Sequence, residues 1–294
     1  MSSGQVPDRK PVTLMKLAER KALGEPIVMI TAYDYPSATV VEEAGVDLVL
    51  VGDSAANTVL GYENTVPVTV DELLMLTRAV RRGLKTPMLV GDLPFGSYEA
   101  SDEQAVLTAQ RFVKEAGCDA VKLEGGGTSV QRAQAIARAG IPVMGHVGLT
   151  PQTATSLGGY RAQGRTAERA SQVMQDAMDL QAAGCFAIVF EAIPAGVTDV
   201  LMEHMEIPVI GIGAGPATDG QVLVLHDLLH VHAGDRMPKF VQRFADVHAE
   251  TARGLEAYAG AVRSRAFPTE AHSYGIAPEE IERLKGQLGG RARV

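Results

Sequence analysis

Acidic and basic side chains follow several apolar segments of this chain, and their types suit metal binding and proton transfer. The apolar stretches before Asp53 and Asp92 both end in Gly-Asp, and similar stretches lead to Glu124, His146 and Glu191. If the carboxylates of Asp53, Asp92 and Glu124 lie together, they repel one another unless a cation binds. Mg²⁺ takes oxygen ligands and leaves positions for a substrate. We therefore interpret these three acids as candidate metal ligands.

The remaining polar residues suggest how a small anion could bind and lose a proton. Lys122 precedes Glu124 by two residues, so both side chains point to the same face of a strand. Lys122 could neutralise a substrate carboxylate, and Ser54 could donate a hydrogen bond to it. Glu191 could accept a proton, with His146 as a supporting group or the next candidate base. An aspartate after a strand is more often a turn residue or a helix cap, and that alternative stays open for each acid taken alone.

One short pattern recurs along the chain and predicts how these residues are positioned. In residues 43–53, 115–125, 138–148 and 182–192, glycine follows an expected helix, then come a β-branched segment and a polar residue. Glycine is typical of the residue just past a helix, and a short apolar run after it is typical of a buried parallel strand. Strict alternation of strands and helices predicts parallel strands joined by right-handed crossovers. About eight such units in roughly 250 residues favour an α/β fold, the closed (β/α)8 TIM barrel, whose strand ends meet at one mouth.

The same pattern gives the expected elements. Thr69 with Glu72, and Ser101 with Gln104, fit capping boxes at the starts of two helices. Residues 1–265 are expected to form a single catalytic barrel, and residues 266–294 a C-terminal tail with one short helix. The expected strands are 27–34, 48–53, 87–92, 120–124, 141–147, 187–192 and 208–213, with an eighth near 225–231.

Composition excludes several classes of protein. A net charge of −8 without a basic stripe argues against nucleic-acid binding. The apolar stretches are too short to span a bilayer, and the first residues contain no apolar segment of a secretion signal. The two cysteines, Cys118 and Cys185, form no disulfide framework and are expected to be small buried residues below the barrel. These features predict a cytoplasmic protein that acts on small molecules, without a membrane partner.

Three further motifs allow more than one interpretation. The runs Gly125–Gly127 and Gly211–Pro216 could hold a phosphate, and close packing at a turn explains them equally well. His226, His230 and His232 resemble a metal cluster in their spacing. Because no carboxylate supports them in the sequence, we expect them to be packing or surface residues.

Several ordered motifs identify a family. They are "TAYDYPSA" (Thr31–Ala38), "DLPFGSY" (Asp92–Tyr98), "AVKLEGG" (Ala120–Gly126), "GHVGLTPQ" (Gly145–Gln152) and "IVFEAIPA" (Ile188–Ala195). With these motifs, roughly residues 10–275 resemble ketopantoate hydroxymethyltransferases. The match is loose over Val224–Phe240, and the expected helix after residue 275 is additional to the family pattern.

The resemblance implies a fold, an activity and a set of site residues. It implies a (β/α)8 barrel, assembled as a homodecamer, that binds one Mg²⁺ per subunit. The activity is transfer of a one-carbon unit from 5,10-methylenetetrahydrofolate to 3-methyl-2-oxobutanoate. By this resemblance Asp53, Asp92 and Glu124 bind the metal. Asp53, Ser54, Asp92 and Lys122 bind the keto acid, and Glu191 is the proton acceptor.

Two other functions compete with this hypothesis. A Mg²⁺-dependent carbon–carbon lyase or mutase of the phosphoenolpyruvate mutase and isocitrate lyase kind would need a reactive cysteine at the mouth, whereas both cysteines precede strands. A non-catalytic barrel would have no reason to keep a cluster of charges. For the folate, Arg161 and Arg165 are the expected contacts for its acidic tail.

Overall fold

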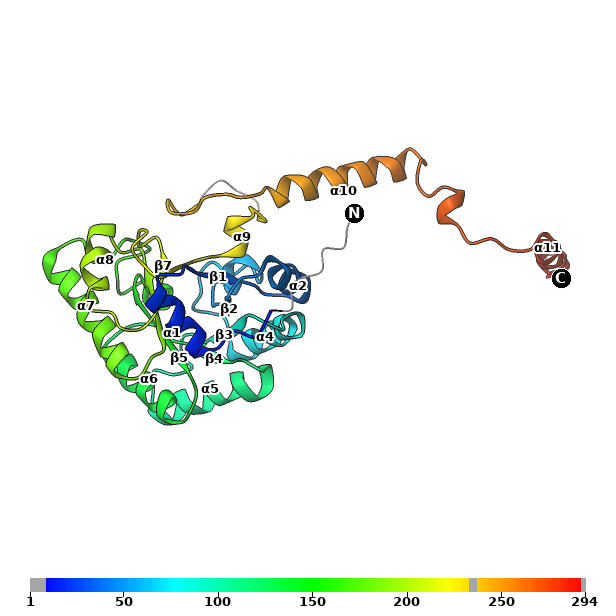
Figure 1. Cartoon of the computed structure of the whole chain (residues 1–294). Coiled ribbons are helices and arrows are strands. Elements are labelled where there is room, and N and C mark those ends of the chain that lie inside the picture. Colours follow the sequence, from blue (N-terminus) through cyan, green and yellow to red (C-terminus); the bar gives the residue numbers. More distant parts are fainter. Residues whose placement is uncertain (1–8, 233–236, 292–294) are drawn as a thin grey trace. The chain divides into compact units, whose positions relative to one another are not determined.

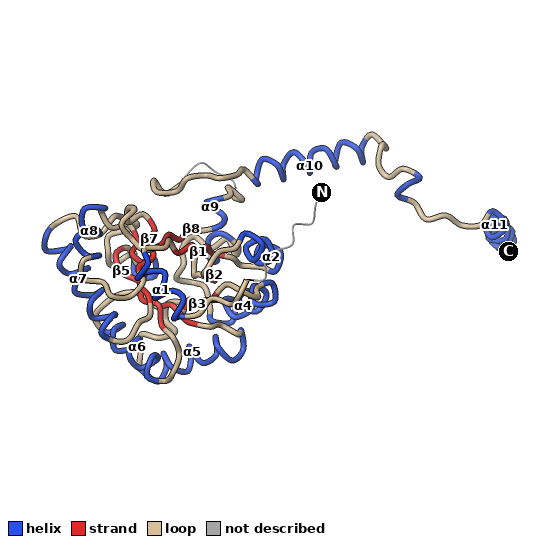
Figure 2. The backbone as a smooth tube through the Cα atoms, in the orientation of Figure 1, coloured by secondary structure: helices blue, strands red, loops and turns tan. Residues whose placement is uncertain are grey.

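The strands of the chain form a closed barrel. The computed structural model describes residues 9–232 and 237–291. The eight strands pair in parallel, each with the next along the chain, and β8 closes the ring against β1. Figure 2 shows helices outside these strands. The predicted (β/α)8 TIM barrel is confirmed, with strands β1 (Ile27–Thr31), β2 (Leu48–Val51), β3 (Met88–Asp92), β4 (Ala120–Lys122), β5 (Val143–Gly148), β6 (Ala187–Glu191), β7 (Val209–Ile212) and β8 (Gly220–Leu223).

Helices connect most of the strands and cover the outside of the barrel (Figure 1). The predicted capping box at α4 is confirmed, because Thr69 accepts a hydrogen bond from the Glu72 amide and Glu72 accepts one from the Thr69 amide. At α5, Ser101 accepts from the Gln104 amide, but the Gln104 side chain accepts from the Ala100 amide instead. The helices of the barrel are α1 (Leu14–Leu23), α2 (Tyr35–Ala44), α3 (Ala55–Thr58), α4 (Val70–Gly83), α5 (Asp102–Ala116), α6 (Thr128–Arg138), α7 (Ala167–Ala182), α8 (Ala195–Met202) and α9 (Leu225–Leu228), with a 3₁₀ turn η1 (Pro151–Thr153).

The glycines of the repeated pattern end the helices as expected. Gly45 and Gly117 follow α2 and α5 with φ angles of 78° and 72°, in the left-handed region. Glycine adopts this conformation without a steric penalty, and it lets the chain leave the helix and return into the next strand.

Two apolar layers stabilise the barrel. The residues of the inner layer also show which side chains of each strand point into the barrel. The outer layer lies between strands and helices and includes Phe112 of α5. The inner layer fills the barrel with strand residues such as Val90 and Val189. Side chains two residues apart on a strand share one face. Asp92 and Glu191 therefore also point into the barrel, one step nearer its mouth.

The eighth strand predicted near residues 225–231 is wrong. Strand β8 is Gly220–Leu223, and Leu225–Leu228 forms α9. A Cβ atom on Gly220 would lie 2.3 Å from the carbonyl oxygen of Ile27 in β1, so the close pairing of these strands requires glycine. Glycine and the exposed glutamine after it give a weak strand pattern. Pairing with β1 and β7 on both sides nevertheless makes this segment a strand.

The chain divides into two compact units, Met1–Ala245 and Asp246–Val294. This boundary falls before residue 265, where the sequence pattern placed the start of the tail. The second unit contains α10 (Val247–Arg263), a 3₁₀ turn η2 (Glu270–His272) and α11 (Pro278–Arg291). Helix α10 groups with the tail, and none of its residues is buried. In the described parts of the chain, no helix combines the length and apolarity needed to cross a membrane.

Candidate active site

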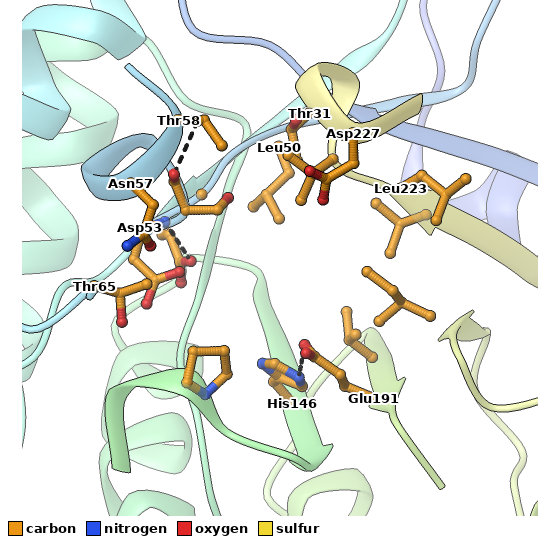
Figure 3. A pocket seen from close by; sticks show the side chains of 18 of the residues that line it. Thr31, Leu50, Asp53, Asn57, Thr58, Thr65, His146, Glu191, Leu223 and Asp227 are labelled. Atoms are coloured by element: carbon orange, nitrogen blue, oxygen red, sulfur yellow. Dashed lines mark hydrogen bonds and ion pairs between the residues drawn. The ribbon is translucent and has the colours of Figure 1, made fainter. Parts of the chain in front are cut away.

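The polar residues singled out in the sequence line one cavity at the carboxyl ends of the strands. Asp92 and Glu191 are the last residues of β3 and β6, and His146 lies within β5. Figure 3 shows Asp53 on one side of the cavity and His146 with Glu191 on another. The cavity has a volume of about 530 Å³, and its lining includes Asp53, Ser54, Asp92, Lys122, Glu124, His146 and Glu191.

Asp53 and Asp92 form a buried acidic pair at the base of this cavity, with exposed fractions of 5% and 0%. Asp92 Oδ2 accepts a hydrogen bond of 3.0 Å from the Asp53 amide, whereas Asp53 Oδ2 is buried and has no hydrogen-bond partner among the described residues. Burial, Asp92 and Glu124 hold the pKa of Asp53 well above its usual value. Burial also raises the pKa of Asp92, although Lys122 opposes the rise.

Neither aspartate caps a helix. Helix α3 begins after Ser54 without a side-chain cap, and the helix that follows Asp92, α5, is capped by Ser101. The helix-cap alternative is therefore wrong for both acids.

Lys122 is the buried cation of the site. Its Nζ lies 2.8 Å from Asp92 Oδ1 and 3.4 Å from Glu124 Oε1. Burial alone would lower the pKa of Lys122, but Asp92, Glu124 and Asp53 raise it above its usual value, so the ammonium stays charged. One ammonium compensates three neighbouring carboxylates only in part, which leaves the base of the cavity short of positive charge.

His146 of β5 lies between two carboxylates from the ends of the neighbouring strands β4 and β6. Its Nδ1 lies 3.1 Å from Glu124 Oε1, and its Nε2 lies 3.1 Å from Glu191 Oε2 (Figure 3). Burial and Lys122 lower the pKa of His146, but Glu124 and Glu191 outweigh them and raise it to about 9. The protonated ring can therefore form ion pairs with both carboxylates at neutral pH. Glu191 Oε1 accepts no hydrogen bond from the described residues and remains free to face a substrate.

Ser54 is held in place by a tyrosine from the motif Thr31–Ala38. Tyr33 Oη lies 2.7 Å from Ser54 Oγ. Burial raises the pKa of Tyr33 to about 12, so its phenol stays neutral and can donate or accept this hydrogen bond. Tyr33 thus fixes the hydroxyl of Ser54 beside Asp53.

Proteins of known family match nearly the whole chain. A family model described as ketopantoate hydroxymethyltransferase matches residues 11–270. The 3-methyl-2-oxobutanoate hydroxymethyltransferase of Carboxydothermus hydrogenoformans is 49% identical over 273 residues, which cover 93% of this chain and 99% of the relative. The chain belongs to the ketopantoate hydroxymethyltransferase family. A mitochondrial member from Arabidopsis thaliana is also 49% identical, over 94% of this chain and 82% of its own length.

Solved structures outside this family share the fold. A phosphonopyruvate hydrolase, crystallised with oxalate and Mg²⁺, is 13% identical and has a TM-score of 0.58, with 96% of this chain and 97% of that chain covered. A 2,3-dimethylmalate lyase of the phosphoenolpyruvate mutase/isocitrate lyase superfamily is 15% identical with a TM-score of 0.52, over 95% and 98% of the chains. At this level of identity these structures support the barrel fold alone.

The acidic base of the cavity in this ketopantoate hydroxymethyltransferase family member fits a cation held by few carboxylates. Within residues 9–232 and 237–291, no three His, Cys, Asp or Glu side chains are arranged as a ready metal site. Mg²⁺ needs only one or two carboxylates, because it keeps several waters and takes substrate oxygens. Asp53 offers a buried oxygen that no described residue contacts by a hydrogen bond, and Asp92 lies beside it.

Glu124 differs from these two aspartates. Its Oε1 already contacts Lys122 and His146, and its Oε2 accepts a hydrogen bond from the Gln152 amide. Lys122 and His146 lower the pKa of Glu124 against the opposing effect of burial. Its role as a third metal ligand stays a prediction.

The structure adds residues to the cavity of this family member that the sequence did not indicate. His232 Nε2 lies 2.9 Å from Asp227 Oδ1, and both residues line the cavity, so this histidine has the carboxylate partner that was not expected. His226 packs as expected, with its ring centroid 5.3 Å from that of Tyr33. The spacing of Asp227 and His232 would have indicated this pair if a helix, and not the eighth strand, had been predicted at residues 225–228. The aromatic residues Tyr160 and Phe240 also belong to the lining.

Close packing is the interpretation that the structure favours for the glycine runs, and the two cysteines are buried. A Cβ atom would lie 2.0 Å from Asp176 Oδ1 at Gly126 and 2.5 Å from the Phe240 ring at Gly213, which favours the close-packing interpretation of both runs. Cys118 and Cys185 are buried free thiols outside the described lining of the cavity. Burial raises the pKa of both thiols, to about 12 for Cys185, so neither forms a reactive thiolate at neutral pH.

Proposed function

We propose that this chain transfers a hydroxymethyl unit from 5,10-methylenetetrahydrofolate to 3-methyl-2-oxobutanoate. The reaction consumes one water and gives 2-dehydropantoate and tetrahydrofolate, a step of pantothenate and coenzyme A biosynthesis. Family membership and the names of relatives at 49% identity support this reaction. The observation that carries it is the convergence of Asp53, Asp92, Lys122 and Glu191 in one cavity.

We further propose that Asp53 and Asp92 hold one Mg²⁺ per subunit. The proposal is supported by the unpartnered Oδ2 of Asp53 and by the raised pKa of both acids in the metal-free protein. When bound, Mg²⁺ withdraws electron density from the keto acid and stabilises the developing enolate charge.

The residues of the chain bind the keto acid and move its proton. The ammonium of Lys122 neutralises the substrate carboxylate, and the hydroxyl of Ser54 donates a hydrogen bond to it. The free Oε1 of Glu191 accepts the proton from C3, while His146 holds Oε2 and fixes the direction of the carboxylate. Apolar side chains from β6, β7 and β8 accommodate the branched methyl groups; they are Val189, Ile212, Val222 and Leu223.

A carbon–carbon lyase on this barrel is less well supported. Such an enzyme would need a thiol at the mouth, and both cysteines are buried outside the described lining. A non-catalytic binding protein would not require a base with a free oxygen beside a charged histidine.

Turnover assays of purified protein separate these functions. We expect 3-methyl-2-oxobutanoate to be consumed only when the folate and a divalent cation are both present. Asp92→Asn should remove most turnover and weaken Mn²⁺ binding measured by electron paramagnetic resonance. The matched control is Asp199→Asn, an exposed aspartate of α8, which should change neither.

Other outcomes of the same assays would contradict the proposal. Cleavage of a keto acid without folate would favour the lyase, and binding without turnover would favour a non-catalytic barrel. Full turnover after exhaustive removal of divalent cations would overturn the metal assignment.

The homodecamer and the cytoplasmic location are proposals of the same kind. Helix α10 has no buried residue and exposes Leu255 and Tyr258, which supports an assembly that covers them. Native mass spectrometry would measure the number of subunits. The two free thiols are compatible with a reducing compartment, and fractionation of cells would test the location.

A further inference from the structure

An aspartate–histidine pair lines the active-site cavity and has no part in the steps described so far. His232 Nε2 lies 2.9 Å from Asp227 Oδ1, and both residues belong to the lining of the cavity. Asp227 comes from α9, and Figure 3 shows it on the side of the cavity opposite to His146 and Glu191. The pair therefore faces the same space as the proposed base, from another wall.

The carboxylate of Asp227 determines which nitrogen of the His232 ring carries the proton. In a neutral imidazole one nitrogen donates and the other accepts, and a carboxylate beside one of them selects it as the donor. The proton therefore belongs on Nε2, and Nδ1 is the basic atom, to which none of the described residues donates a hydrogen bond. The side chains of Asp227 and His232 are 18% and 32% exposed, so a substrate in the cavity can reach the pair. This is the arrangement of an oriented acid–base group.

The proposed function requires a second proton transfer, and this inference rests on that function. The reaction consumes one water, and the oxygen of this water becomes the hydroxyl of the new hydroxymethyl group. The water must therefore lose a proton as its oxygen bonds to the methylene carbon of the folate. The same oxygen must gain a proton when the enolate carbon bonds to the one-carbon unit. Glu191 holds the C3 proton during these steps, so another group has to carry the proton of the water.

Among the titratable side chains of the described lining, His232 suits this transfer best. Most of the others are already assigned to the metal, the keto acid or one another; they are Asp53, Asp92, Lys122, Glu124, His146 and Glu191. The remaining ones are Asp227, Tyr160 and His232. Burial raises the pKa of the Tyr160 phenol, so it stays neutral and is a poor base. A histidine ordinarily titrates near neutral pH, so it can both take a proton and return it.

We propose that His232 is the catalytic residue that moves the proton of the water to the product hydroxyl, with Asp227 as its positioning residue. The bond from the methylene carbon to N10 of the folate breaks as N10 receives the proton that Glu191 took from C3. The water oxygen bonds to the methylene carbon, and Nδ1 of His232 takes one proton of the water. The bond to N5 then breaks, N5 receives the second proton of the water, and formaldehyde is released into the cavity. The enolate carbon bonds to the formaldehyde carbon, and the protonated His232 returns its proton to the oxygen.

Two reactions of the same protein separate this role from that of Glu191. Deuterium exchange at C3 of the keto acid, measured with Mg²⁺ and without folate, requires Glu191 and does not involve the pair. Turnover with 5,10-methylenetetrahydrofolate requires both. His232→Gln should lower kcat for turnover by about 10²–10⁴-fold, while its exchange rate should stay within about twofold of the wild type. Because exchange requires a folded site that binds the keto acid, the unchanged rate also shows that the variant is folded.

A double-mutant comparison tests the positioning role of Asp227. Asp227→Asn should lower kcat less than His232→Gln does, because the ring loses its orientation but keeps its basic nitrogen. Residues that act as one unit are not additive, so adding Asp227→Asn to His232→Gln should lower kcat no further. The matched control is His204→Gln, which replaces an exposed histidine outside the described lining and should leave turnover and exchange unchanged.

Several results would overturn the assignment of His232 while the proposed function stands. One is a kcat of His232→Gln within about twofold of the wild type. Another is an equal loss of exchange and turnover, which would indicate a structural role. A raised KM for the folate with an unchanged kcat would indicate a binding role instead. An equal loss from Asp227→Asn with and without His232 would show that Asp227 acts independently.

The wild-type protein reports the proposed function separately. If it neither exchanges deuterium at C3 nor consumes keto acid with the folate, the proposed function is overturned, and this inference with it.

Discussion

Replacing Asp53 with asparagine should make the metal-free protein more stable while it removes most activity. Burial, Asp92 and Glu124 raise the pKa of Asp53 in the folded chain, and in the unfolded chain this carboxyl has its ordinary pKa of about 3.9. The folded protein therefore binds the proton more tightly than the unfolded chain. This contribution to stability is fully present below about pH 4 and is lost as the pH rises through the folded pKa. Above that value the charged Asp53 destabilises the fold, and asparagine removes the penalty.

The size of the gain follows from linkage. Each unit by which folding raises the pKa of Asp53 lowers the free energy of unfolding at high pH by about 1.4 kcal/mol, and the asparagine variant recovers this amount. For a barrel of this size that is about 3–6 °C in Tm. Asp53 Oδ2 has no hydrogen bond to lose, and the Asp53 amide that donates to Asp92 is kept in the variant. We therefore expect lost hydrogen bonds to reduce the gain in stability only a little.

Thermal unfolding in EDTA between pH 5 and pH 8 measures this effect. The Asp53→Asn variant should melt above the wild type at pH 8, and the difference should shrink towards pH 5. Mg²⁺ should raise the Tm of the wild type more than that of the variant, because a ligand that binds only the folded state stabilises it by mass action. Asp199→Asn, at an exposed position of α8, is the control and should shift Tm little. A variant that melts at or below the wild type in EDTA at pH 8 would refute the reasoning.

Four further predictions follow, three for the site and one for the cysteines. Glu191→Gln should slow folate-independent deuterium exchange at C3 by about 10²–10⁴-fold with little change in Mg²⁺ affinity, and exchange at the wild-type rate would exclude Glu191 as the base. His146→Gln should slow exchange less and shift its pH profile, because it acts through Glu191; an unchanged profile would contradict this positioning role. Lys122→Met leaves buried carboxylates without their cation and should cost about 3–5 kcal/mol in EDTA melts, whereas an unchanged Tm would show that the pair is not stabilising. Cys118→Ala with Cys185→Ala should keep turnover within a few-fold, and rapid alkylation of the native protein with loss of activity would revive the lyase hypothesis.

Local sequence patterns determined much of the barrel. Strand positions follow from short apolar runs after helix-ending glycines. Asp92 comes two residues after Val90, whose side chain points into the barrel, so the side chain of Asp92 points into the barrel as well. The capping box at Thr69 was visible for the same reason, since its hydrogen bonds join residues three positions apart. Such features depend on neighbours in the chain, so the sequence alone contains them.

Other features depend on residues that only the closed barrel brings together. Strand β8 contains glycine and glutamine, and it forms because β1 and β7 pair with it from both sides. His146 contacts Glu124 and Glu191 because β5 lies between β4 and β6, and no spacing along the chain encodes both contacts. The Asp227–His232 pair enters the cavity only because the chain turns into α9 after β8. The sequence by itself determined which side chains face the mouth, because the alternation of a strand is local; tertiary structure decided which of them touch, because those contacts depend on barrel closure and strand register.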